Sequence, residues 1–262
     1  MPHRVREAAV YSLLAARRGK LPANRFMIFG QGRTGSTLLV DLLNSHPDVF
    51  TYGEILQRYV VTDVLRPRWW VEGLCTLSKK PTVGFKVKYG QIAVAQHKDP
   101  ARTLEDFAHH GWKIIYLKRR NLLRHAVSDL RAEKTGHFHT VKGSDLLRQG
   151  GEKRATVRLD WDELVTAMRH RRDTAELERS ALANVPHMIV EYETDLSNAE
   201  QQKRSMLAVF DFIGVPPVEA RTDFQKVTAR SLGQQIENFD ELVPTIKSSP
   251  FAEFLDDETE TH

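Results

Sequence analysis

The 262-residue sequence contains a single cysteine, Cys75. One cysteine cannot close an intramolecular disulfide or build a cysteine-rich metal cluster, so we expect a reducing, cytoplasmic environment. Long apolar runs are also missing, because none approaches the roughly 18 residues of a membrane span. Residues 1–22 are rich in arginine and their apolar stretch is short and broken, which predicts a basic N-terminal helix rather than a secretory signal.

The sequence also lacks a strong excess of positive or negative charge. The net charge of +4 and the pI of about 9.1 suit an anionic small ligand, but they are too weak to indicate a nucleic-acid partner. Hydrophobic residues (41%) and charged residues (27%) are ordinary for a globular protein. We therefore predict a single domain over residues 1–262, with a mobile loop at 135–156 and a frayed tail at 256–262.

Short apolar runs alternate with helical patterns along the chain. We expect strands at residues 26–29, 49–52, 83–87, 113–117 and 187–192, and helices near residues 36–45, 54–64, 104–109 and 122–134. This alternation predicts an α/β fold with a central, mostly parallel sheet and helices on both faces, a three-layer P-loop-like architecture.

A glycine-rich segment joins the first expected strand to a helix. Gly30 and Gly35, followed by Ser36 and Thr37, have the spacing of a Walker A loop, but Ser36 stands where that loop carries lysine. Backbone N–H groups and the positive end of the helix dipole bind an anion at such a place. Arg33 is the one cation within the loop. The sequence therefore favours a shorter phosphate held without a metal over a triphosphate with magnesium.

Charged residues follow the second and third expected strands. Strand alternation puts Lys86 and Lys88 on one face. Burying both is costly unless an anion neutralises them, and an edge strand with one hydrated face would avoid that cost. Glu54 follows the second strand, where it could serve as a general base, a ribose ligand or a helix cap. The residues alone leave these alternatives open.

A basic cluster ends the fourth expected strand directly before a helix. Arg120 should lie at the carboxyl edge of the sheet, where open α/β sheets bind ligands. Ser128 follows about two helical turns later and can face the same direction. An arginine with a hydroxyl suits a second phosphate, and a solvated basic helix start is the alternative.

Together these motifs resemble 3′-phosphoadenosine-5′-phosphosulfate (PAPS)-dependent sulfotransferases, in particular the bacterial carbohydrate branch that includes trehalose and nodulation-factor sulfotransferases. Residues 32–37 are similar to the family's 5′-phosphosulfate loop, and Arg120 with Ser128 is similar to its 3′-phosphate motif. Residues 84–91 resemble the strand that supplies a lysine in this branch, and residues 188–216 resemble its late strand–helix unit.

The resemblance covers about residues 25–239 and has two departures. Lys88 and Gly90 differ from the apolar and acidic residues expected on the third strand. The glycine-rich C-terminal nucleotide loop of the cytosolic animal enzymes is missing, and residues 230–239 stand in its place.

The resemblance implies a PAPS-dependent sulfotransferase that acts on a hydroxyl of a carbohydrate or glycolipid without a metal. Arg33, supported by Lys86, would contact the sulfuryl and leaving-group oxygens, and Glu54 would take the acceptor proton. The nucleotide would be held at its 5′-phosphate by Gly32, Arg33, Thr34, Gly35, Ser36 and Thr37, and at its 3′-phosphate by Arg120 and Ser128.

Two other functions fit part of the sequence. Gly30, Gly32 and Gly35 also form a GxGxxG pattern with Glu54 at roughly the ribose-binding distance, as in NAD(P)-dependent oxidoreductases. The cluster at Arg120 counts against this reading, since a dinucleotide fold gives it no special role. The chain could also be a P-loop nucleotide kinase or binding module. It would then lack both the Walker A lysine and a clear magnesium-binding aspartate.

The histidines show no metal-ligand spacing, so we predict no metal site. His46, before Pro47 at a helix end, is interpreted as a capping or packing residue. His137 and His139 lie in the expected mobile loop and suit either a sugar or solvent. Besides the acceptor, two partners are considered. One is a second copy of the chain in a homodimer, and the other is a membrane surface contacted through the N-terminal helix.

Overall fold

The computed structural model describes residues 3–17, 20–136, 156–222 and 231–256. The chain divides into two compact units, the first formed by residues 1–118 and 175–222 and the second by residues 119–174 and 223–262. The predicted single domain over residues 1–262 stays a prediction. The predicted mobile loop, with His137 and His139, and the predicted frayed tail lie almost wholly outside the described residues.

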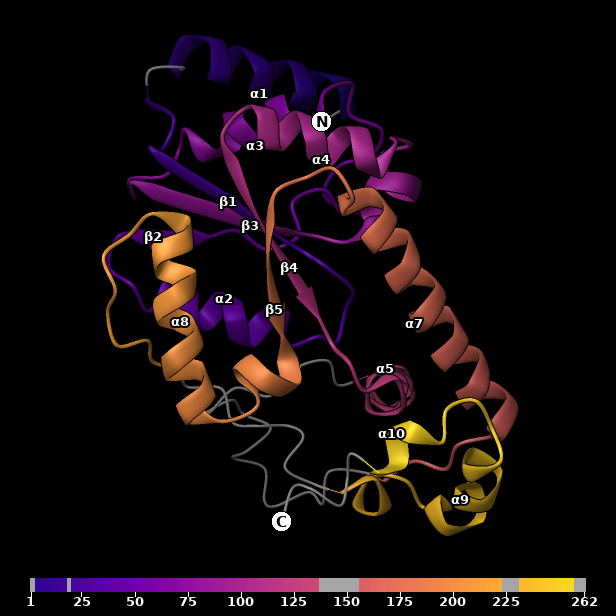
Figure 1. Cartoon of the computed structure of the whole chain (residues 1–262). Helices are drawn as coiled ribbons and strands as arrows, with labels where there is room; N and C mark the ends of the chain where they lie inside the picture. Colours follow the sequence, from indigo (N-terminus) through magenta and orange to yellow (C-terminus); the bar gives the residue numbers. More distant parts are fainter. Residues whose placement is uncertain (1–2, 18–19, 137–155, 223–230, 257–262) are drawn as a thin grey trace. The chain divides into compact units, whose positions relative to one another are not determined.

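The first unit is built on a five-stranded sheet in which every described pairing is parallel (Figure 1). The strand order is β2-β3-β1-β4-β5, so β3 lies between β1 and β2. The strands are β1 (Asn24–Phe29), β2 (Val49–Thr51), β3 (Thr82–Val87), β4 (Trp112–Lys118) and β5 (His187–Glu191). All five predicted strands are present, and only their end residues differ from the expectation.

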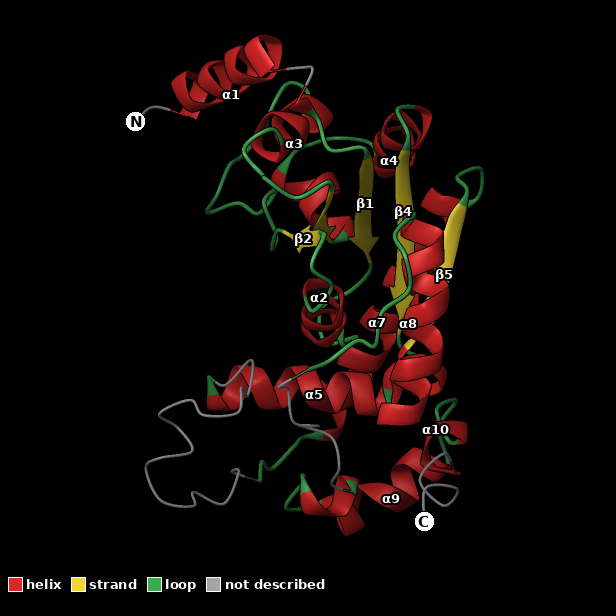
Figure 2. Cartoon of the chain, turned by 90° about the vertical axis from the view of Figure 1, so that its left-hand side faces the viewer, coloured by secondary structure: helices red, strands yellow, loops and turns green. Residues whose placement is uncertain are grey.

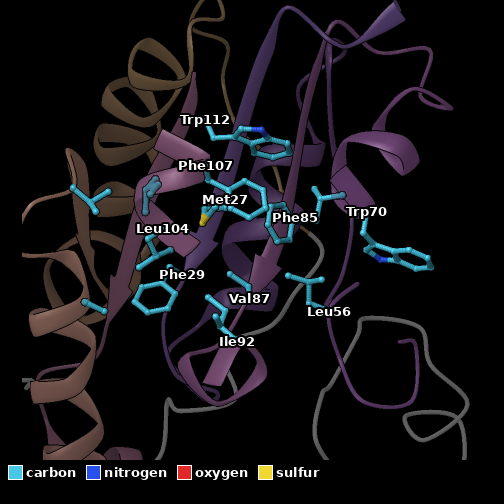
Figure 3. Packing of buried hydrophobic residues seen from close by; sticks show 14 of the residues in the cluster. Met27, Phe29, Leu56, Trp70, Phe85, Val87, Ile92, Leu104, Phe107 and Trp112 are labelled. Atoms are coloured by element: carbon cyan, nitrogen blue, oxygen red, sulfur yellow. The ribbon is translucent and has the colours of Figure 1, made fainter. Parts of the chain in front are cut away.

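Helices cover both faces of this sheet because alternate residues of β1 enter two separate cores. Phe26 and Ile28 pack with α2 (Ser36–Asn44) and α8 (Ala199–Ile213). Met27 and Phe29 pack with α3 (Pro67–Cys75) and α4 (Pro100–His109), where Figure 3 shows the aromatic contacts. In that second core, Phe85, Phe107 and Trp112 form three ring contacts with centroids 5.2–5.6 Å apart. The predicted three-layer α/β fold is confirmed.

The N-terminal helix α1 (His3–Arg17) packs against α3 (Figure 2). The buried carboxylate of Glu7 accepts hydrogen bonds from Tyr11 Oη at 2.7 Å, Arg4 Nη1 at 2.7 Å and the Leu65 backbone N–H at 2.6 Å. The contact with Leu65 leaves the helix and holds the predicted basic helix on its own unit. A homodimer or a membrane surface as its partner stays a prediction. Within the described residues, no helix combines the length and the apolar character that crossing a bilayer requires.

The predicted helix at residues 54–64 is wrong, because this segment forms turns and α3 begins only at Pro67. The buried side chain of Gln96 supplies the reason. Its amide donates to the carbonyls of Leu56 and Val61, each at 2.9 Å, and accepts from the Val64 backbone N–H at 2.9 Å. One side chain thus satisfies backbone groups that helical hydrogen bonds would otherwise satisfy. The short π-helix η2 (Gln91–Ala95) directly precedes Gln96.

The second unit has a separate apolar core built from helices and short turns. Its elements are α5 (Leu122–Thr135), the first part of α7 (Trp161–Leu182), the 3₁₀ turn η4 (Leu232–Gln234), α9 (Phe239–Lys247) and α10 (Glu253–Asp256). Leu123, Met168 and Ile246 are among its buried residues. The helix α5 was predicted and α7 was not. The late strand–helix unit of the first unit is also present, as β5, the π-helix η3 (Tyr192–Leu196) and α8.

Candidate functional site

The glycine-rich segment forms a tight loop between β1 and α2. Gly30, Arg33 and Gly35 have φ angles of 155°, 67° and 88°. Gly30 passes so close to β4 that a Cβ atom built on it would lie 2.1 Å from the Leu117 carbonyl oxygen. Inside the loop, the buried Thr34 hydroxyl donates to the Gln31 carbonyl at 2.8 Å. The loop conformation therefore depends on a residue without a side chain at position 30.

The loop leads directly into the N-terminus of α2, as the sequence predicts. Gly35 is the N-cap residue and has no side chain to offer to the first helical N–H groups. Ser36 and Thr37 open the helix and are half-buried. Because the first N–H groups of a helix have no partner within the helix and carry its positive dipole end, this arrangement suits an anion such as a phosphate.

Glu54 lies beside two lysines at the carboxyl ends of β2 and β3. Its Oε1 atom lies 3.5 Å from Lys86 Nζ, and its Oε2 atom lies 3.0 Å from Lys88 Nζ. Oε2 also accepts hydrogen bonds from Gln91 Nε2, at 2.6 Å, and from the Gln57 amide. The structure thus brings together two predicted site residues, Glu54 and Lys86, and adds Lys88.

Lys86 belongs to an interior strand and Lys88 directly follows that strand, so the hydrated-edge alternative is wrong. β3 pairs with β1 on one side and with β2 on the other, and the Lys86 backbone N–H donates to Gly53 O at 3.2 Å. Lys86 is 15% exposed and Glu54 12%. Glu54 is therefore the anion that neutralises the enclosed Lys86, and it also pairs with the more exposed Lys88.

The electrostatics of this cluster shift two pKa values. Burial acts to raise the pKa of Glu54, but the charge and hydrogen bond of Lys88, the charge of Lys86 and the Gln91 hydrogen bond together hold it below its ordinary value. Burial lowers the pKa of Lys86, which the charge of Glu54 opposes and that of Lys88 reinforces. At neutral pH we therefore expect Glu54 to be ionised.

A hollow that is partly open to solvent joins the glycine loop to this cluster. It is lined by loop residues, by strand ends and by the ionisable cluster, namely Ile28, Gly30, Gln31, Thr34, Ser36, Glu54, Lys86, Val87, Lys88 and Leu117. With both lysines protonated and Glu54 ionised, the ionisable groups of this lining leave one net positive charge. An anion bound at the loop would therefore also meet the lysines.

The other predicted site residues have different positions. Arg33 lies in the loop with a left-handed backbone, and a Cβ atom built on Gly32 would lie 3.6 Å from Lys88 Cε. Arg120 is exposed and directly precedes α5, whose N-cap residue Asn121 accepts from the Arg124 backbone N–H at 2.8 Å. Arg120 and the half-buried Ser128 both belong to the second unit. Their role at a 3′-phosphate stays a prediction.

Sequence reasoning missed the two amides that hold Glu54. Gln91 bridges the cluster, since its Nε2 atom donates to Glu54 and its Oε1 atom accepts from the Lys88 backbone N–H at 3.0 Å. Gln57 donates to the same carboxylate from the turn that replaces the predicted helix. A neutral amide carries no charge or periodicity signal, so only the proximity of Gln91 to Lys88 in the sequence could have indicated it.

A buried carboxylate fixes the loop from a second side. Glu178, from the part of α7 that belongs to the first unit, accepts hydrogen bonds from Gln31 Nε2 at 3.5 Å and from Tyr116 Oη at 3.2 Å. Glu178 and Gln31 are both buried. This contact could not be anticipated from the sequence, because α7 was not predicted.

His46 has the structural role that the sequence predicts. Its Nδ1 atom accepts a hydrogen bond from the Asp48 backbone N–H at 3.0 Å, so its Nε2 atom must donate to Pro216 O at 2.9 Å. The ring is buried and contacts Phe210. Among the residues that the structure describes, no group of three or more histidine, cysteine, aspartate or glutamate side chains is placed to hold a metal ion.

Comparison with known proteins gives relatives that match over most of this chain and most of their own length. The chain is 26% identical over 250 residues to nodulation protein H of Rhizobium meliloti, and this alignment covers 90% of the chain and 96% of that protein. It is 28% identical over 244 residues to nodulation protein H of Rhizobium tropici, covering 88% and 92%. No family model matches the chain.

Two solved structures are similar at low sequence identity. Mouse sulfotransferase SULT7A1 complexed with PAP is 12% identical, with a TM-score of 0.49 over 97% of this chain and 96% of that one. Sulfotransferase STF9 from Mycobacterium avium is 13% identical, with a TM-score of 0.46 over 95% and 81%.

Proposed function

We propose that this member of the PAPS-dependent sulfotransferase family transfers a sulfuryl group to a hydroxyl of a carbohydrate or glycolipid by in-line displacement without a metal. One observation carries the proposal. The loop that suits a phosphate and the Glu54–Lys86–Lys88 cluster line the same hollow. A phosphate at the loop would therefore hold a sulfuryl group near two cations and a base. The similarity to the nodulation proteins H over most of the chain supports the proposal.

The donor binds through its anionic groups. The backbone N–H groups of Thr34–Thr37 and the hydroxyls of Ser36 and Thr37 hold the 5′-phosphate at the start of α2. Arg120 and Ser128 hold the 3′-phosphate, which distinguishes PAPS from other adenine nucleotides. Bound PAPS supplies the activated sulfuryl group.

The residues around the hollow then stabilise the transfer. The acceptor oxygen bonds to sulfur while the bond from sulfur to the bridging phosphate oxygen breaks, and the acceptor proton passes to Glu54. Negative charge grows on the leaving oxygen, where Arg33 and Lys86 neutralise it. Among the described residues, Lys88, Gln91 and Gln57 contact Glu54 Oε2, whereas only Lys86 contacts Oε1, at a longer distance, so Oε1 accepts the proton.

The dinucleotide alternative meets an objection in the strand order. Dinucleotide-binding folds place the second strand next to the first, which brings its terminal carboxylate to the ribose. Here β3 separates β1 from β2, and the Glu54 carboxylate is bonded to lysines and amides. A kinase remains the second candidate, and it would require magnesium to bind its nucleotide.

We propose that the reaction takes place in the cytoplasm. Cys75 is free and buried, and burial raises the pKa of its thiol to about 12. This cysteine is therefore a packing residue and takes no part in the proposed chemistry.

Thermal unfolding with nucleotides tests the proposed function. In EDTA, adenosine 3′,5′-bisphosphate at 100 times its dissociation constant adds about 2.7 kcal/mol and should raise Tm by roughly 5 °C or more. AMP, which lacks the 3′-phosphate, should give a much smaller shift. A shift with NADPH alone would point to the oxidoreductase, and a shift with ATP that needs magnesium would point to the kinase.

The pH profile of kcat/KM tests the role of Gln91. Replacing Gln91 by leucine removes one hydrogen bond that lowers the pKa of Glu54, while Lys86 and Lys88 still face the carboxylate. The acid limb of the profile, where Glu54 gains its proton, should move to higher pH by up to about one unit. Gln201→Leu, at a glutamine bonded to Ser197, is the control. An unmoved acid limb in Gln91→Leu would show that another group controls it.

A further inference from the structure

We infer that Lys88 is a further catalytic residue, which pairs with Glu54 in the free enzyme and binds the sulfuryl oxygens once the donor is present. The inference rests on the proposed function and assigns a role to one of the two residues that depart from the family pattern near the third strand. Lys88 lines the hollow together with Lys86 and Glu54.

Lys88 extends from the end of β3 across to the phosphate-binding loop. It follows Val87, the last residue of that strand. Its Nζ atom lies 3.0 Å from Glu54 Oε2. Its Cε and Nζ atoms also lie 3.6 and 3.7 Å from the position that a Cβ atom on Gly32 would occupy. The ammonium group is therefore located between the proposed base and the loop.

The two lysines differ in how firmly they are held. The Lys86 side chain is 15% exposed and that of Lys88 is 40% exposed. An ion pair that is partly in solvent contributes little net free energy, so Lys88 can exchange one anionic partner for another at low cost. Lys86 is more enclosed and stays near Glu54 Oε1. Lys88 is therefore the cation that can move from Glu54 to the sulfuryl oxygens of the bound donor.

Donor binding supplies the competing partner. A sulfuryl group beyond a phosphate at the loop would bring negatively charged oxygens into a hollow that carries one net positive charge. When Lys88 turns to these oxygens, Glu54 loses its closest cation and becomes a stronger base. Gln91 and Gln57 continue to hold the Glu54 carboxylate in place. The base is thus activated in the same step in which the sulfuryl group is neutralised.

Comparing two nucleotides isolates this role, because adenosine 3′,5′-bisphosphate lacks the sulfuryl group that PAPS carries. Lys88→Met should weaken PAPS binding about tenfold or more, measured by calorimetry without acceptor, and should leave bisphosphate binding within about threefold of wild type. Lys88→Arg keeps the charge and should recover most of the PAPS affinity. Lys98→Met, which removes a lysine paired with Asp63 at 3.4 Å, is the matched control and should change neither affinity.

The outcomes separate this inference from the proposed function. Equal weakening of both nucleotides in Lys88→Met, or no weakening of either, would overturn the role of Lys88 while leaving the sulfotransferase in place. A wild-type protein that binds neither nucleotide would overturn both. The unfolding temperature of each unliganded variant, expected within a few degrees of wild type because Lys88 is partly exposed, shows whether folding is intact.

Discussion

Glu54→Gln is expected to lower kcat by about 10²- to 10⁴-fold, the usual contribution of a general base. The amide that replaces the carboxylate has nearly the same shape, and its oxygen can still accept from Gln91 and Lys88. It cannot take the proton of an acceptor hydroxyl. The substitution also leaves Lys86 and Lys88 without a counter-charge in the hollow. We therefore expect adenosine 3′,5′-bisphosphate to bind as tightly as in wild type or more tightly.

Turnover and binding are measured separately to test this expectation. Turnover is the release of adenosine 3′,5′-bisphosphate from PAPS in the presence of an acceptor found by screening carbohydrates and glycolipids. Glu219→Gln removes the carboxylate of an exposed ion pair with Lys203, so it controls for the loss of one negative charge and should leave kcat unchanged. Undiminished turnover in Glu54→Gln would assign the base to another group. His46 could not replace it, since both ring nitrogens bond to the backbone.

The sequence predicted the central sheet and the glycine-rich turn between β1 and α2 because both are encoded locally. Each strand is a short apolar run, and the turn from β1 into α2 carries its glycines at fixed positions. The same reasoning could state that Lys86 and Lys88 share a face and that an anion must neutralise them if they are buried. It could not identify Glu54 as that anion, because the pairing depends on β2 lying next to β3. Strand order is a property of the assembled sheet.

The failed helix prediction at residues 54–64 has a related cause. The prediction counted apolar spacing, but the polar groups of this segment are used elsewhere. Gln57 donates to Glu54, and the buried Gln96 satisfies backbone groups of three residues in the turn. A glutamine that replaces helical hydrogen bonds from a distant part of the chain leaves no pattern in the sequence. Tertiary contacts overrode the local preference here.

Gly30→Ala is expected to cause the largest loss of stability among single-methyl substitutions in the loop. A Cβ atom at this position would lie 2.1 Å from the carbonyl oxygen of Leu117 and 3.2 Å from its carbonyl carbon. Both are backbone atoms of the interior strand β4, so no side-chain rotation can relieve the clash. Overpacking and backbone strain of this kind cost about 3 kcal/mol or more, which corresponds to a fall in Tm of roughly 6 °C or more.

The same substitution should also abolish nucleotide binding, because the loop can relieve the clash only by moving away from β4. Such a movement would disturb the hydrogen bond from the Gly30 N–H to Val87 O, 3.3 Å long, and with it the start of the anion site. Gly90→Ala is the matched control. Gly90 has a φ of −64°, and no atom lies within 4 Å of its added Cβ, so stability should change little or rise by about 0.4–1 kcal/mol. If Gly30→Ala kept its Tm and bound adenosine 3′,5′-bisphosphate normally, the loop could not approach β4 as closely as described, and the hollow that supports the proposed function would have a different shape.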